Sequence, residues 1–98
     1  MKIKAIFSKT GDIRFISHLD LMRLFQRAIR RAGLPVVITK GFSPHIKISI
    51  TRALKLGIES GSEELVMSMQ EAVAGELITR SMNSKLPGGI RIKEIKEF

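Results

Sequence analysis

The order of periodic segments along the chain is the feature that most constrains its fold. Alternation of apolar and polar residues predicts strands at 2–8, 45–52, 63–69 and 90–98. Residues 12–16 and 36–39 are predicted to be extended as well, and helical spacing predicts helices over 17–33 and 72–85. Residues 53–62 are ambiguous. This order predicts an α+β domain, a ferredoxin-like antiparallel sheet with two helices packed on one face.

The length and composition fit one small domain, which we place at residues 1–98. The chain contains no cysteine, which excludes disulfides, thiolate metal sites and cysteine nucleophiles. No apolar run approaches the roughly 18 residues that span a bilayer, so we expect no membrane segment. We take the cytoplasm as the default compartment.

Positive charge is concentrated in the first part of the sequence. Residues 1–55 contain twelve Lys or Arg and two acidic residues, a net charge of +10, whereas residues 56–98 contain five basic and seven acidic residues, a net charge of −2. This asymmetry favours a polyanionic partner, most often nucleic acid. The alternative is a basic surface that serves only solubility.

The segment from Ser17 to Gly33 has clear signals for both ends of a helix. Ser17 is at the N-cap position, Asp20 lies near the positive end of the helix dipole, and Gly33 followed by Pro35 ends the helix. One predicted face is apolar and consists of Leu21, Leu24, Phe25, Ala28 and Ala32. The opposite face, which we call the arginine face, consists of Arg23, Arg27, Arg30 and Arg31.

The arginine face differs from an ordinary solvated surface. Arg23 and Arg27, and likewise Arg27 and Arg31, are like-charge pairs four residues apart, which repel each other, and only Asp20 offsets any of this charge. Arginine binds phosphate in a bidentate manner and stacks on bases. We therefore predict that this face binds an anion, with a plain surface as the alternative.

A second basic feature is the segment KGFSPHIK at 40–47. Lys40, His45 and Lys47 flank Phe42. An aromatic ring among cations suits single-stranded nucleic acid, whose bases stack while its phosphates follow the charges. The alternative is a hairpin loop whose Phe42 folds into the core.

Signals for catalysis are weak. The chain contains two histidines, His18 and His45, and none of the motifs of phosphate-binding loops, zinc proteases or serine hydrolases. Two histidines with a lysine are the groups of a metal-free ribonuclease, which we keep as a minor alternative. We predict no catalytic residue, no metal site and no cofactor. The sequence LPGG at 86–89 is explained as a helix stop, and its backbone N–H groups are a weak candidate for contacting a phosphate.

Three stretches of the chain resemble one bacterial family. The segments GDIRFISHLDLMRLFQRAIRRAGLPV, GFSPHIKIS and LKLGIESGSEEL are similar to the radical-SAM-linked domain family, which occurs alone or fused behind a radical SAM enzyme. The resemblance covers essentially the whole chain, which is similar to the N-terminal half of the family's region. It implies a link to RNA or tRNA modification or processing, with this domain handling the substrate. The residues that match the family's pattern are Arg14, Phe15, Ser17, His18, Asp20, Arg23, Arg27, Arg30, Arg31, Gly41, Phe42, Pro44 and Lys47.

Together these features predict an RNA-binding module, for tRNA or another structured RNA, that acts with an RNA-modification or processing enzyme and is not catalytic itself. The alternative is a protein-interaction module whose basic helix docks a radical SAM partner. Exposed sheet edges make a homodimer a further expectation. The residues predicted to bind nucleic acid are Arg23, Arg27, Arg30, Arg31, Lys40, Phe42 and Lys47, with His18, His45 and Arg14 as additional candidates.

Overall fold

The fold is built on a four-stranded antiparallel sheet. The computed structural model describes residues 1–51 and 59–97. The strands in this part of the chain are β1 (Lys2–Lys9), β2 (Ile48–Ile50), β3 (Ser60–Ser68) and β4 (Ile90–Glu97). Their order across the sheet is β2-β3-β1-β4, so β1 is central and pairs antiparallel with both β3 and β4.

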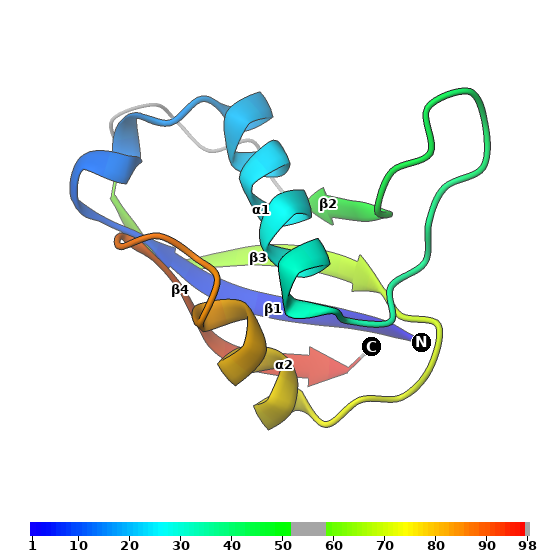
Figure 1. Cartoon of the computed structure of the whole chain (residues 1–98). Coiled ribbons are helices and arrows are strands. Elements are labelled where there is room, and N and C mark those ends of the chain that lie inside the picture. Colours follow the sequence, from blue (N-terminus) through cyan, green and yellow to red (C-terminus); the bar gives the residue numbers. More distant parts are fainter. Residues whose placement is uncertain (52–58, 98) are drawn as a thin grey trace.

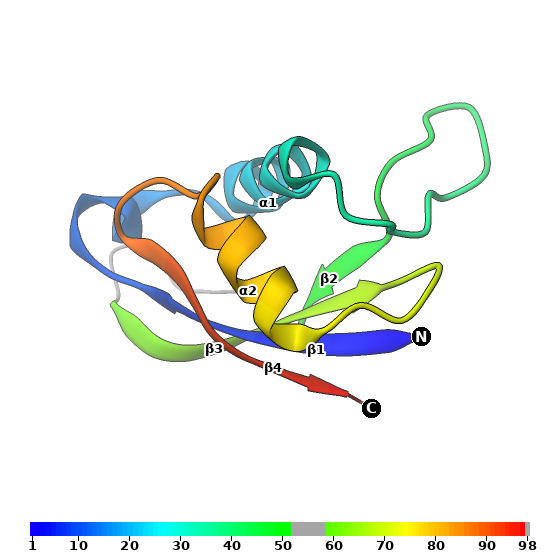
Figure 2. The same cartoon turned by 60° about the horizontal axis from the view of Figure 1, so that its bottom comes forward.

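Two α-helices cover one face of this sheet. They are α1 (His18–Ala32) and α2 (Gly75–Asn83), and a 3₁₀ helix, η1 (Gly11–Phe15), connects β1 to α1 (Figure 1). Figure 2 shows both helices on the same side of the sheet. The predicted α+β arrangement is therefore confirmed, and the strand order is compatible with the ferredoxin-like topology. Among the described residues, no helix is both long and apolar enough to cross a membrane.

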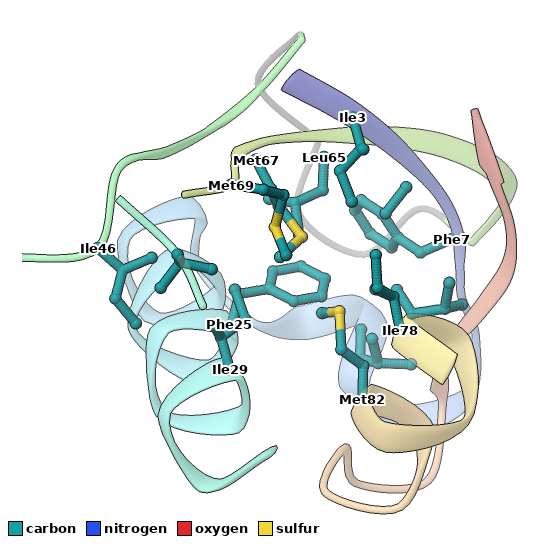
Figure 3. Packing of buried hydrophobic residues seen from close by; sticks show 14 of the residues in the cluster. Ile3, Phe7, Phe25, Ile29, Ile46, Leu65, Met67, Met69, Ile78 and Met82 are labelled. Carbon is teal, nitrogen blue, oxygen red and sulfur yellow. The ribbon is translucent and has the colours of Figure 1, made fainter. Parts of the chain in front are cut away.

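The hydrophobic core lies between the helices and the sheet (Figure 3). Phe7 of β1 and Phe25 of α1 are both fully buried, and their rings meet edge to face with centroids 4.9 Å apart. The other buried side chains of the cluster include Ile3, Ile29, Ile46, Leu65, Met67, Met69, Ile78 and Met82. This packing fixes α1 on the sheet and thereby fixes the direction of its outer face.

The ends of α1 are those that the sequence predicts. The Ser17 hydroxyl accepts a hydrogen bond from the Asp20 N–H at 3.1 Å, which is the expected N-cap. Gly33 ends the helix in the left-handed conformation at φ 69°, and its N–H donates to the Arg30 carbonyl.

The buried face of α1 differs slightly from the prediction. Leu21, Phe25 and Ala28 are buried as expected, but Ile29 is buried too, whereas Ala32 is only half-buried. Leu24, also predicted to be in the core, is half-buried as well and borders a groove between α1 and the connection from α2 to β4. Ile29 belongs to the buried cluster that also contains Ile46, and the helical pattern alone does not show where such a neighbouring element lies.

The prediction of an extended segment at 12–16 is wrong, because most of these residues belong to η1. The Arg14 guanidinium donates to the Gly11 carbonyl at 2.8 Å, and the Ile16 N–H donates to the Ile13 carbonyl at 3.0 Å. These local hydrogen bonds carry the chain from the end of β1 to the start of α1.

The predicted strands at 36–39 and 45–52 are only partly correct. Within 45–52, three residues join the sheet as β2, and residues 36–39 form isolated bridges instead of a strand. The prolines and glycine of this region, Pro35, Gly41 and Pro44, interrupt regular pairing. Residues 52–58, which include Arg52 and much of the ambiguous segment 53–62, lie outside the described residues.

Residues 36–47 form an irregular hairpin, which we call the arm. The Thr39 N–H donates to the His45 carbonyl at 2.8 Å, and the Lys47 N–H donates to the Val37 carbonyl at 2.9 Å. At its base, the Val37 N–H donates to the Ser68 carbonyl of β3 at 2.8 Å. The arm therefore begins at the β2 edge of the sheet, and its tip projects from the body of the domain (Figure 1).

α2 is shorter than the predicted helix at 72–85. Gly75, predicted near its middle, is its first residue, and Ile78 and Met82 are its buried side chains. A Cβ at Gly75 would lie 3.1 Å from the Ile95 Cβ, so the glycine allows the start of the helix to approach β4 closely.

Asn83, the last residue of α2, closes part of the exposed edge of β4. Its side-chain amide donates to the Ile92 carbonyl at 3.0 Å, and its Oδ1 accepts from the Ile92 N–H at 2.7 Å. The amide thus replaces a neighbouring strand at this position. It also fixes the start of the connection at residues 84–89.

Candidate nucleic-acid interface

The arginine face of α1 is exposed. Asp20 lies 3.5 Å from Arg23, but the two side chains are 61% and 65% exposed, so this ion pair contributes little. Within the described part of the chain, Arg27, Arg30 and Arg31 have no acidic partner at ion-pair distance. Most of the charge on this face is therefore not neutralised by the protein.

The sequence around α1 extends this positive region. No acidic residue occurs between Asp20 and Glu59, a stretch that includes most of α1, the arm and β2. Positive charge is therefore concentrated on α1 and the arm, and a surface of this kind attracts anions in general.

Two basic residues near η1 have local partners instead. Lys9 is 1% exposed, and its ammonium donates to the Arg14 carbonyl at 3.4 Å. The Arg14 guanidinium lies 4.4 Å from the centre of the Phe15 ring. Arg14, an additional candidate from the sequence, is thus held by contacts within η1.

Phe42 lies at the tip of the arm and is fully exposed, with a relative exposure of 108%. The alternative in which Phe42 folds into the core is therefore wrong. Ile46, which is buried, anchors the base of the arm, and Lys40 and Lys47 are exposed on either side of the tip. The ring is free to stack on a ligand.

The two histidines lie on different elements. His18 is the exposed first residue of α1. In the arm, the His45 N–H donates to Thr39 Oγ1 at 3.1 Å, and His45 Nδ1 lies 3.0 Å from the Ser43 carbonyl. Among the described residues, no three His, Cys, Asp or Glu side chains form a group that could hold a metal ion.

The predicted binding residues fall into two groups. Arg27 and Arg31 border a groove of about 460 Å³ between α1 and residues 84–87. The second group, Lys40, Phe42 and Lys47, belongs to the arm, which follows the C-terminal end of α1 on the side of β2 (Figure 1). Arg23 and Arg30 lie on the exposed surface of α1 and do not line this groove.

The connection from α2 to β4 is part of this surface, and the sequence pattern named the backbone of residues 86–89 there but not the Lys85 side chain. Lys85 and Leu86 line the same groove as Arg27 and Arg31. The sequence LPGG at 86–89 predicted a helix stop and offered its backbone N–H groups to a phosphate, but neither signal reveals which element the loop touches.

The sheet face opposite the helices is not suited to base stacking. RNA-recognition motifs stack bases on aromatic side chains of their central strands. Here the alternation of β1 directs Lys4 to the outer face, where it lies 3.5 Å from Glu64 of β3. Among the described residues, the phenylalanines lie in the core, η1 and the arm. The groups suited to RNA are therefore on α1 and the arm.

The fold and these exposed groups define a small basic α+β domain. Residues 2–98 match the family described as "Uncharacterized protein conserved in bacteria (DUF2344)". Because this match covers nearly the entire chain, the protein belongs to that family. A search of the curated proteins finds no match.

Proposed function

We propose that this protein is an RNA-binding module that acts in the cytoplasm with an RNA-modification or processing enzyme and is not catalytic itself. Its ligand is tRNA or another structured RNA, whose backbone phosphates bind to the arginine face. The arm adds Lys40 and Lys47 as further phosphate contacts and Phe42 as a stacking residue. The partner enzyme that fits the resemblance of the sequence is a radical SAM enzyme.

The observation that carries this proposal is the set of exposed, like-charged arginines on α1. Repulsion between such residues destabilises a helix slightly unless anions neutralise them. The arginine fork matches the geometry of phosphate oxygens. An RNA backbone offers a row of such groups, whereas a solubilising surface has no need for unpaired arginines side by side.

Replacing Arg27 and Arg30 together with glutamate is expected to weaken RNA binding by about 100-fold or more, because charge-assisted contacts are worth about 1.5–3 kcal/mol each. Both side chains are exposed, so the fold is expected to remain. The measurement is fluorescence anisotropy of labelled RNAs across a salt series. For the unchanged protein on single-stranded RNA, about four phosphate contacts give a slope near −3 when the logarithm of the binding constant is plotted against the logarithm of the salt concentration.

The matched control reverses the same amount of charge elsewhere. Lys2→Glu with Lys96→Glu changes two exposed residues of the sheet and is expected to have a much smaller effect. Normal RNA binding by the Arg27→Glu, Arg30→Glu protein would show that the arginine face is not the site. If no RNA binds even at low salt, while a radical SAM partner binds through the same face, the protein-interaction alternative replaces the proposal.

Phe42→Ala is expected to weaken binding of single-stranded RNA by about fivefold to 150-fold, the range for loss of one base stacked on an aromatic ring. Phe42→Trp should restore or exceed the original affinity, because tryptophan retains a stacking surface. The same anisotropy titration measures both variants. Equal affinity of the alanine and tryptophan variants would argue that the ring does not stack on RNA.

A further inference from the structure

The groove beside the arginine face contains residues to which the proposed function gives no role. It lies between α1 and residues 84–87, and both views show this connection close to η1 and α1 (Figures 1 and 2). Its volume of about 460 Å³ falls within the range of small-molecule pockets. One monomer of a larger polymer also fits a space of this size.

The rim of the groove is basic and its floor is apolar. Arg27 and Arg31 from α1 and Lys85 from the connection border it, and among the described residues that line it none is acidic. The apolar part is formed by Leu24 and Leu86, both half-buried. This combination matches a ligand that has negative charge next to a flat, weakly polar ring, as a nucleotide does.

A second hollow adjoins the groove along the same connection. Ile13 of η1 lines both spaces, and the second one, of about 500 Å³, is also lined by Gly88 and Gly89. Asp12 lines this far end. Its carboxylate disfavours a phosphate there and accepts hydrogen bonds from hydroxyl or amino groups. Because the two hollows share Ile13 they adjoin, and we refer to them together as the channel, whose basic end is at Arg27, Arg31 and Lys85.

We infer that this channel binds a single-stranded segment of RNA, with one unstacked base on the Leu24–Leu86 floor and the adjacent phosphates at Arg27, Arg31 and Lys85. The inference rests on the proposed function. It adds that the bound RNA is single-stranded and that Leu24, Lys85 and Leu86 contact it. A duplex uses the channel poorly, because its bases are stacked inside the helix and only its backbone reaches the rim.

The test compares a labelled oligouridine strand of about ten nucleotides with a blunt RNA duplex of the same length. A strand of about ten nucleotides is typical of the sites that bind single strands. The unchanged protein is expected to bind the strand more tightly. Lys85→Glu is expected to weaken strand binding about tenfold, as loss of one charge-assisted contact does. Leu24→Gln, which retains a good helix former, should weaken binding of the strand and leave that of the duplex unchanged.

Lys2→Glu is the matched control for charge, since Lys2 is exposed on β1 and does not line the channel. Equal losses for Lys85→Glu and Lys2→Glu, or equal affinity for strand and duplex, would overturn the channel as the site. The loss of binding in the Arg27→Glu, Arg30→Glu protein would then still support the proposed function. Failure of the unchanged protein to bind either RNA at low salt would overturn both. If Lys85→Glu does not fold, Lys85→Gln replaces it and is expected to weaken strand binding in the same direction.

Discussion

Replacing Phe25 with alanine is expected to lower the free energy of unfolding by about 3–5 kcal/mol, the usual cost of removing a buried phenylalanine. Phe25 is fully buried, and its ring contacts that of Phe7 edge to face. The substitution removes this contact and leaves a cavity between α1 and β1. For a domain of this size, such a loss is a large part of the total stability, which for most proteins is about 5–15 kcal/mol.

Chemical denaturation followed by circular dichroism measures this effect, because the chain has neither tryptophan nor tyrosine as a fluorescent probe. Phe42→Ala is the matched control, since it makes the same chemical change at a fully exposed ring. It is expected to change the free energy of unfolding by less than about 0.5 kcal/mol. Similar losses for the two variants would mean that α1 is not held on the sheet by the Phe7–Phe25 contact.

The two phenylalanines also show what the sequence can and cannot predict. Helical spacing placed Phe25 on the buried face of α1, because that face repeats every three to four residues and is fixed locally. Phe42 lies between glycine and proline in a segment without periodicity, so its environment depends on pairing with distant residues. At the base of the arm, the Ser68 carbonyl accepts a hydrogen bond from the Val37 N–H. Ser68 is 31 positions from Val37, so nothing in the sequence around Val37 indicates this contact.

The same distinction applies to the candidate site. The arginine face was predictable from α1 alone, because four arginines on one helix need only the helix to become neighbours. The channel was not, because Arg31 and Lys85 come from elements far apart in the sequence and meet only through packing on a shared sheet. The 3₁₀ geometry of η1, whose Ile13 lines both hollows, was missed for a different reason. Residues 12–16 were predicted to be extended, but local hydrogen bonds around Arg14 and Gly11 determine the conformation.

Gly89→Ala is expected to lower the free energy of unfolding by about 2–6 kcal/mol, the combined scale of a strained backbone and an overpacked site. Gly89 has φ 95°, which side-chain-bearing residues rarely adopt. A Cβ there would lie 2.5 Å from the Thr10 carbonyl oxygen and 2.6 Å from Ile13 Cγ2. Relief of these contacts requires the connection to move away from η1 and would break the hydrogen bond from the Thr10 N–H to the Gly89 carbonyl, now 2.8 Å.

Gly88→Ala provides the control one residue earlier in the chain. Gly88 has a negative φ, and a Cβ there would meet no atom within 4 Å. Its substitution is expected to change the free energy of unfolding by less than about 1 kcal/mol, or to stabilise the protein slightly by restricting the unfolded chain. Denaturation curves of the two variants therefore separate a general effect of losing a glycine from the specific contact with η1. If Gly89→Ala is as stable as Gly88→Ala, the connection is not packed against η1 as described. The proposed channel would then lack the wall that the connection and η1 form together.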